Sequence, residues 1–223
     1  MLIDVSHDIR DGMTTYKGLP GPMICDFLSR ENSRGLYPEG TEFQIGRIDM
    51  VANTGTYLDS PFHRFEHGRD LAELDLAMLA DLEALVVRKP YGTGLAVDVS
   101  DVSPHDVRSK AVLIHTGWDV HWGEPAYLER HPFVTAAAAE WLKANGAVLV
   151  GIDSHNIDDT SAHARPVHTT LLGADILICE HMTNLGQLPE EGFRFFAVPP
   201  KVVGLGTFPV RAFASISDGC DQA

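Results

Sequence analysis

An aspartate and a histidine stand four residues apart in the stretch 53–65, which reads NTGTYLDSPFHRF. In an extended chain Asp59 and His63 would share a face, because alternate side chains of a strand point the same way. A carboxylate beside an imidazole can bind a metal ion or transfer a proton. Taken alone, Asp59 is more simply a turn or capping residue. The nearby histidine favours the functional interpretation.

A second pair of candidates lies in the stretch 168–180, which begins with His168 and ends with Glu180. Glu180 closes the apolar run ILIC, which is typical of a buried strand, and sites in α/β sheets form at the carboxyl ends of strands. Burying a bare carboxylate is costly, so Glu180 must be solvated, paired or bound to a metal.

Polar residues also crowd behind the apolar run AVLVGI, starting with Asp153 and continuing through His155, Asp158, Asp159 and His163. This cluster could bind a metal, or it could be a polar loop that caps a sheet edge, and the sequence leaves both interpretations open. The other histidines that we considered lack a carboxylate at a convincing spacing and are interpreted as structural: His115, His121, His131 and His181.

Other catalytic motifs are absent from the sequence. It contains no phosphate-binding P-loop, no G-x-G-x-x-G after a strand, no G-x-S-x-G, no C-x-x-C and no H-E-x-x-H. No serine or cysteine has the setting of a nucleophile. If the protein is an enzyme, an activated water is therefore the expected nucleophile.

The elements that must position these residues are mostly short apolar strands. Residues 135–145 are the clearest helix, because they are rich in alanine, follow a capping Thr135 and precede Gly146. We predict an α/β domain that spans 1–223, with a mixed and partly barrel-like central sheet and this helix on one face. Strands are expected within the following segments: 1–9, 44–52, 82–90, 110–118, 147–153, 174–180 and 193–214.

Composition limits the partners and the compartment. The 31 acidic and 17 basic residues give a net charge of −14, which excludes a general electrostatic route to nucleic acid. Three distant cysteines indicate no disulfide framework and fit a reducing compartment. The N-terminus does not read as a signal peptide, and no apolar run approaches the roughly 18 residues needed to cross a bilayer. We expect a cytoplasmic protein without membrane partners.

Segment 53–63 resembles the motif His-x-Gly-Thr-His-x-Asp-x-Pro-x-His of the cyclase family of metal-dependent hydrolases, which includes bacterial kynurenine formamidases and isatin hydrolases. Residues 3–18, 111–154, 168–189 and 193–214 resemble other parts of the same family. The resemblance implies a swivelling β/β/α fold and a homo-oligomer, either a dimer or a tetramer. It also implies that Asp59, His168 and Glu180 bind a divalent metal ion and that His63 is catalytic.

The sequence departs from the family motif at two metal positions, where Asn53 and Tyr57 replace histidines. An amide oxygen is a weak ligand for Zn²⁺, and a phenol ionises only with difficulty. We therefore predict one ion per chain, Zn²⁺ or Mn²⁺, held by the other three residues. Tyr57 could instead donate a hydrogen bond to a substrate carbonyl, and His155 could supply a substitute ligand.

The resemblance predicts a small-molecule substrate with a C–N amide bond, either an arylformamide such as N-formylkynurenine or a cyclic amide. A metal-activated water would attack, with His63 as the general base. Tyr16, Phe62 and Trp118 are candidate walls of the substrate site. Two alternatives remain open: a metal-poor relative that binds a ligand without hydrolysing it, and a lyase or dehydratase that uses His63 and Tyr57.

Overall fold

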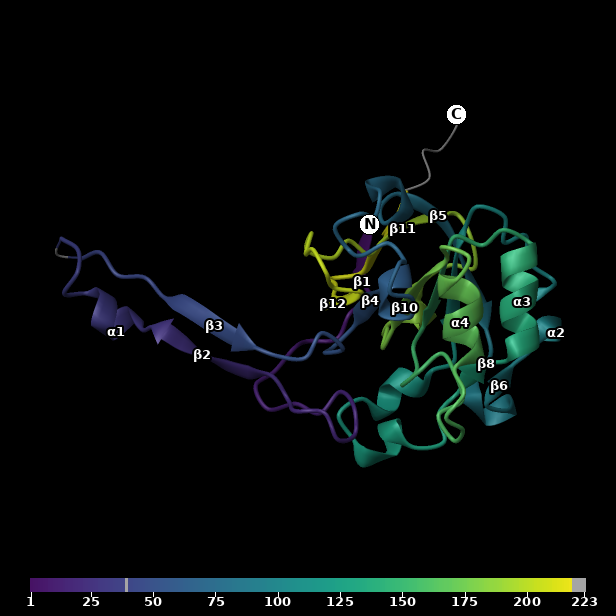
Figure 1. Cartoon of the computed structure of the whole chain (residues 1–223), viewed down its shortest axis with the longest axis horizontal. Coiled ribbons are helices and arrows are strands. Elements are labelled where there is room, and N and C mark those ends of the chain that lie inside the picture. The colour runs from purple at the N-terminus through teal and green to yellow at the C-terminus, as the bar shows by residue number, and fades with distance from the viewer. Residues whose placement is uncertain (39, 218–223) are drawn as a thin grey trace.

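The computed structural model describes residues 1–38 and 40–217, so Cys220 lies outside the described residues. Its centre is a nine-stranded sheet in the order β1-β13-β11-β5-β7-β9-β10-β4-β12 (Figure 1). The four strands from β5 to β10 run parallel, and the flanking pairs are antiparallel. This arrangement confirms the predicted α/β class with a mixed, partly barrel-like sheet. The strand bounds are β1 Leu2–Asp4, β4 Tyr57–Asp59, β5 Leu82–Arg88, β7 Ala111–His115, β9 Leu149–Ile152, β10 Leu177–Glu180, β11 Phe193–Phe196, β12 Thr207–Pro209 and β13 Phe213–Ile216.

Both faces of the parallel strands are buried, which explains why these segments read as continuous apolar runs. In β5, Leu85 and Val87 belong to the core beneath the helices, whereas Ala84 and Val86 belong to the core on the opposite face. Helices α3 (Ala136–Ala144) and α4 (Pro166–Leu172) cover the first face, and the short α2 (Val99–Val102) packs beside α3 (Figure 1). A small parallel pair, β6 (Ala96–Val97) and β8 (Phe133–Val134), lies apart from the main sheet.

Helix α3 begins and ends where its sequence predicts. The side chain of Thr135 accepts a hydrogen bond from the backbone N–H of Ala138 at 3.1 Å, which caps the helix. Gly146 follows with a φ of +79°, a left-handed conformation that glycine adopts without steric cost. Ala138, Ala139 and Leu142 face the sheet and are buried.

The opening motif is not extended throughout, and here the sequence prediction is wrong. Strand β4 ends at Asp59, and residues Pro61–His63 form a turn of 3₁₀ helix. Pro61 fixes its own φ and has no N–H to donate to a neighbouring strand, so it begins the turn. The turn still brings His63 back beside Asp59. Gly206 permits this, because a Cβ there would lie 2.2 Å from the backbone nitrogen of His63.

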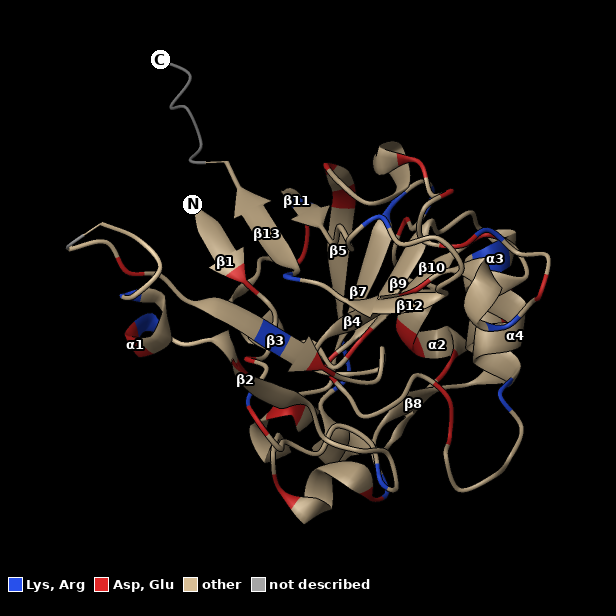
Figure 2. Ribbon diagram, turned by 60° about the vertical axis from the view of Figure 1, so that its left-hand side comes forward, with Lys and Arg blue, Asp and Glu red and all other residues tan. Residues whose placement is uncertain are grey.

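A two-stranded arm, residues 23–49, projects from the body of the molecule (Figure 1). Strands β2 (Met23–Leu28) and β3 (Ile45–Asp49) pair antiparallel, and the short α1 (Arg30–Ser33) follows β2. Both acidic and basic residues occur along the arm (Figure 2). The sequence predicted β3 but missed β2, so the arm itself was not foreseen.

Short 3₁₀ turns complete the described chain, at Leu76–Met78, Tyr91–Thr93, Trp118–His121, Pro125–Leu128 and Leu185–Gln187. None of the helices in the described part of the chain is long and apolar enough to cross a membrane.

Candidate active site

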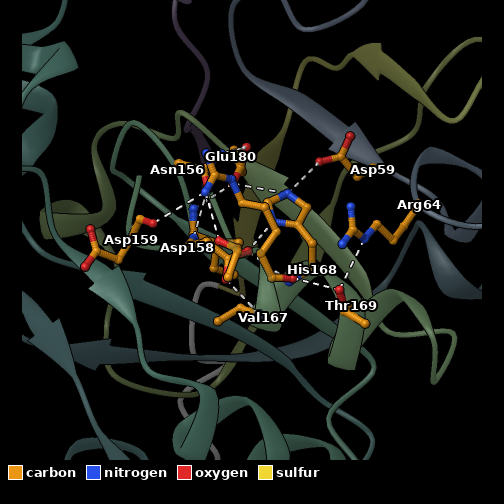
Figure 3. A network of polar contacts seen from close by, with 12 residues as sticks. Asp59, Arg64, Asn156, Asp158, Asp159, Val167, His168, Thr169 and Glu180 are labelled. Carbon is orange, nitrogen blue, oxygen red and sulfur yellow. Dashed lines mark hydrogen bonds and ion pairs between the residues drawn. The ribbon is translucent and has the colours of Figure 1, made fainter. Parts of the chain in front are cut away.

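His168 stands at the centre of the polar network at the carboxyl ends of β9 and β10 (Figure 3). Asp158 accepts hydrogen bonds from the backbone N–H groups of Val167 and His168, at 2.7 and 3.1 Å, and so fixes the first turn of α4. The same carboxylate accepts the Nδ1–H of His168 at 2.6 Å. Because Nδ1 is engaged, the other ring nitrogen, Nε2, is left to face the site.

Two carboxylates from neighbouring strands converge on Nε2 of His168. It lies 3.7 Å from Asp59 Oδ2 on β4 and 3.6 Å from Glu180 Oε1 on β10. Antiparallel pairing of the two strands places Tyr57 opposite Glu180 and Asp59 opposite Ile178. The structure therefore brings together the three residues that the resemblance implied as metal ligands.

Asp59 and His168 are spaced for a divalent cation. Their separation of 3.7 Å is too long for a hydrogen bond but close to the spacing of about 3.4 Å between ligands that each lie about 2.1 Å from a tetrahedral ion. Asp59 Oδ2 is buried and has no hydrogen-bond partner, a costly arrangement unless a cation binds there. Among the described residues, Asp59, His63 and His168 form the group whose ligand atoms all lie within 4.8 Å of one another. Glu180 is not in that group, and its Oε1 accepts the backbone N–H of Ile157 at 2.6 Å.

The carboxylates around His168 also favour a positive charge at this site. Burial alone would lower the pKa of His168, but the carboxylates of Glu180, Asp158 and Asp59 outweigh it and raise that pKa to about 10. Burial raises the pKa of Glu180, an effect that the nearby imidazolium opposes. A proton on His168 thus takes the place that a metal ion would fill, and the two compete for the ring.

His63 lines the cavity, and Thr207 orients its ring. The Thr207 hydroxyl donates to Asp59 Oδ1 and lies 2.8 Å from His63 Nδ1. A hydroxyl has a single hydrogen, so its oxygen must accept from His63, which places the imidazole proton on Nδ1. The lone pair is then on Nε2, as a general base requires. No sequence pattern indicated Thr207, which reaches Asp59 through the pairing of β12 with β4.

The two degenerate motif positions hold neutral groups. The Tyr57 side chain is fully buried, and its hydroxyl donates to Glu180 Oε2 at 2.5 Å. Burial, followed by the charges of Glu180 and Asp59, raises the pKa of Tyr57 well above its ordinary value, so it remains a phenol. Asn53 lines the same cavity. Tyr57 therefore positions Glu180 here, and its hydroxyl is already engaged.

His155 lies among aromatic rings and is absent from the cluster of donor atoms around Asp59. Its ring centroid is 4.3 Å from that of Tyr16 and 5.7 Å from that of His181. Burial lowers the pKa of His155 to about 3 and that of His181 well below its ordinary value, so both stay neutral. The suggestion that His155 replaces a missing metal ligand has no support in this arrangement.

The remainder of the polar cluster after β9 is structural. Asp153 accepts hydrogen bonds from the backbone N–H groups of Thr116 and Gly117, at 2.8 Å each, and so stabilises the loop after β7. Asp159 and His163 do not line the cavity. The sequence left open a metal site and a capping loop, and the capping loop describes most of this cluster. Asp158 is the exception, because it orients His168 through a hydrogen bond to Nδ1.

The cavity that His168 and Glu180 line has a volume of about 300 Å³. Of the predicted wall residues, Tyr16 lines it, and the Tyr16 hydroxyl accepts a hydrogen bond from Asn156 at 2.6 Å. Phe62 does not line it, nor does Trp118, which is buried and donates its indole N–H to the carbonyl of Tyr127. The full lining is Tyr16, Leu19, Asn53, Tyr57, His63, Arg64, Asn156, Arg165, His168 and Glu180.

Known proteins share this sequence pattern. A family model described as "Putative cyclase" matches residues 3–159. A kynurenine formamidase of Erythrobacter litoralis (strain HTCC2594) is 31% identical over 200 residues, which make up 90% of this chain and 87% of that protein. The chain therefore belongs to the cyclase family, as its motifs had suggested.

Solved structures share the fold. A potential metal-dependent hydrolase with cyclase activity matches with a TM-score of 0.78 at 25% identity, over 96% of both chains. Isatin hydrolase A from Labrenzia aggregata, bound to benzyl benzoate, matches with a TM-score of 0.84 over 98% of this chain and 94% of that chain. Its identity of 19% shows a likeness of fold alone. These matches confirm the predicted fold class.

Proposed function

We propose that this chain is a metal-dependent hydrolase that cleaves the C–N bond of an amide, either an arylformamide such as N-formylkynurenine or a cyclic amide. The chain is an enzyme with a small-molecule substrate. The observation that carries the proposal is the approach of Asp59 Oδ2 and Glu180 Oε1 to His168 Nε2, next to a cavity that His63, His168 and Glu180 line. The kynurenine formamidase relative supports the choice of substrate.

Asp59, His168 and Glu180 would hold one divalent ion, Zn²⁺ or Mn²⁺. When bound, such an ion polarises the substrate carbonyl and lowers the pKa of a water molecule. One imidazole and two carboxylates suit either metal. The neutral Asn53 and the hydrogen-bonded Tyr57 offer no second set of charged ligands, which supports a single ion per chain.

The side chains divide the remaining work of hydrolysis. His63 Nε2 accepts a proton as the water oxygen attacks the carbonyl carbon, and it returns that proton to the nitrogen as the C–N bond breaks. Thr207 keeps the proton of the resting imidazole on Nδ1. Tyr57 and Asp158 hold Glu180 and His168 in place. An arylformamide gives formic acid and an amine, whereas a cyclic amide opens to one product that carries both the carboxylic acid and the amine.

The test is hydrolysis by purified protein loaded with Zn²⁺ or Mn²⁺, using N-formyl aromatic amines and cyclic amides or lactones. We expect one metal ion per chain, and we expect oxygen from isotopically labelled water to appear in the acid product. His63→Ala should abolish turnover. Product formation without labelled oxygen would favour a lyase, and the absence of both metal and turnover would favour a ligand-binding protein.

We also propose that the enzyme is a cytoplasmic homo-oligomer and that the arm is its interface. Several large apolar residues of the arm each expose between 39% and 74% of their surface: Met23, Ile24, Phe27, Leu36, Tyr37, Ile45 and Ile48. At about 150–200 Å² per side chain, they expose roughly 600 Å². Two reciprocal arms and the surfaces they cover would then bury more than the total of about 1,600 Å² typical of a stable interface.

Further features support this assembly and its compartment. A two-stranded hairpin on its own is marginally stable in water, so the arm needs a surface to pack against. Cys25 on the arm is a free, exposed thiol, which suits a reducing cytoplasm. Sedimentation of wild type should give a dimer or a larger oligomer, and Phe27→Asp should shift it to monomers. Leu76→Asp, at an equally exposed leucine outside the arm, is the control, and a monomeric wild type would refute the interface.

A further inference from the structure

Two arginines line the cavity of an otherwise strongly acidic chain. Arg64 directly follows the turn that carries His63, and Arg165 precedes the helix that carries His168. Each guanidinium therefore belongs to the same local element as a residue of the site. With a net charge of −14 for the whole chain, two cationic groups in one small cavity are a local reversal of charge.

Both side chains are held in place by neutral acceptors. The Nε of Arg64 donates to the hydroxyl of Thr169 at 3.2 Å (Figure 3). Arg165 Nη1 donates to the carbonyls of Ala162 and Ala164, at 2.6 and 2.9 Å, and more weakly to that of Asp159 at 3.5 Å. Fixing a guanidinium in this way reduces the entropy that it loses when it binds a ligand.

In the described part of the chain, neither guanidinium has a carboxylate oxygen within 4.0 Å. Arg69 and Arg211, by contrast, pair with Asp175 and Asp4. The Asp159 carboxylate is near enough for Arg165 to contribute to its lowered pKa, after the hydrogen bonds from Ser161, but it makes no such pair. The N–H groups that remain on Arg64 and Arg165 are thus available to an anion.

We propose that Arg64 and Arg165 form a carboxylate subsite, so the preferred amide substrate carries a carboxylate in addition to its scissile bond. A guanidinium presents parallel N–H groups that match the two oxygens of a carboxylate. Glu180, which lines the cavity, repels an anion, so the arginines direct the substrate's charged end away from Glu180. This inference rests on the proposed hydrolytic function.

The test compares matched substrates that differ only in charge: 2-, 3- and 4-formamidobenzoate against the corresponding formamidobenzamides. For wild type we expect kcat/KM to favour one benzoate over its benzamide by at least about tenfold, because hydrogen bonds between a guanidinium and a carboxylate are charge-assisted. Arg64→Gln should lower this ratio roughly tenfold, mainly through KM. Arg165→Gln should also lower it, with one metal ion per chain retained as evidence that the site is intact.

Arg194→Gln is the matched control, because it removes a charge from β11, away from the cavity, and should leave the ratio unchanged. A wild-type ratio near one, or an unchanged ratio in both cavity variants, would overturn the subsite.

Calorimetric titration with benzoate provides a second readout that needs no turnover. The Kd of Arg64→Gln should be about tenfold weaker than that of wild type, and equal values would count against the subsite. If wild type hydrolyses none of the amides, the proposed function fails, and this titration still decides whether the subsite exists.

Discussion

Two groups of residues at the site differ in charge. Around His168 the carboxylates of Glu180, Asp158 and Asp59 outweigh burial and raise the pKa of the imidazole to about 10. The two substituted motif positions, Asn53 and Tyr57, are neutral, and the phenol donates a hydrogen bond to the same Glu180. A cage of buried carboxylates requires a cation, whereas an amide and a phenol do not. The replacement of two motif histidines by Asn53 and Tyr57 thus lowers the number of ions that we expect. It leaves Asp59, His168 and Glu180 in place as candidate ligands.

Loss of a charged ligand should have the largest effect. Asp59→Asn keeps the shape but removes the negative charge and the unpartnered oxygen, so metal content should fall below about one tenth of an ion per chain. Because a bound metal contributes several kcal/mol to catalysis, kcat/KM should fall at least about a thousandfold. Elemental analysis and amide hydrolysis measure the two effects. Asp175→Asn, an exposed position with a φ of +59°, should match wild type.

Loss of the orienting hydroxyl should cost less. Thr207→Val removes the bridge between Asp59 and His63, so the ring can adopt the wrong tautomer, and kcat should fall roughly 10- to 100-fold. The metal content should stay at one ion. Thr207→Ser restores a hydroxyl and should recover most of the rate. A valine variant with full activity, or a serine variant as slow as valine, would remove Thr207 from the mechanism.

A buried histidine outside the cavity lining, His155, should make the fold sensitive to acid. His155 has a folded-state pKa of about 3, below the ordinary value of 6.5, because of burial. Between these values the unfolded chain binds a proton that the folded chain does not, so stability is complete above about pH 6.5 and declines as the pH falls. The slope for one histidine is about 1.4 kcal/mol per pH unit, a tenfold change in the folding equilibrium.

Urea denaturation between pH 4 and pH 7 measures this slope. His155→Gln should reduce the slope by about that amount, since glutamine does not titrate. Equal slopes for wild type and His155→Gln would show that the imidazole is protonated in the folded protein.

Restoring the motif should give the smallest effect, a doubling of metal content. The double substitution Asn53→His and Tyr57→His adds two imidazoles beside Asp59, and elemental analysis should then find two ions per chain instead of one. Each single variant should stay near one ion, because one imidazole and a shared carboxylate make an incomplete site. A double variant that still holds a single ion would show that the backbone around Asn53 no longer allows a second site.

Local patterns were sufficient for much of the sheet and for α3. Apolar β-branched runs gave β5, β7, β9 and β10, because strands buried on both faces need no polar alternation. The turn at Pro61–His63 was missed because alternation was extended through a proline that ends pairing. The arm was missed because β2, which reads MICDFL, shows neither the alternation that revealed the equally exposed β3 nor an unbroken apolar run.

The sequence by itself indicated the family and the mixed sheet, because motif residues and apolar runs are local properties of the chain, and through the family resemblance it nominated Asp59, His168 and Glu180 as ligands. Only the tertiary structure decided how those side chains are supported. Thr207 bonds to Asp59 across 148 positions of sequence, and Tyr57 bonds to Glu180 across 123. Such contacts depend on strand order and register, which arise when the whole sheet buries its faces, and no local pattern encodes them.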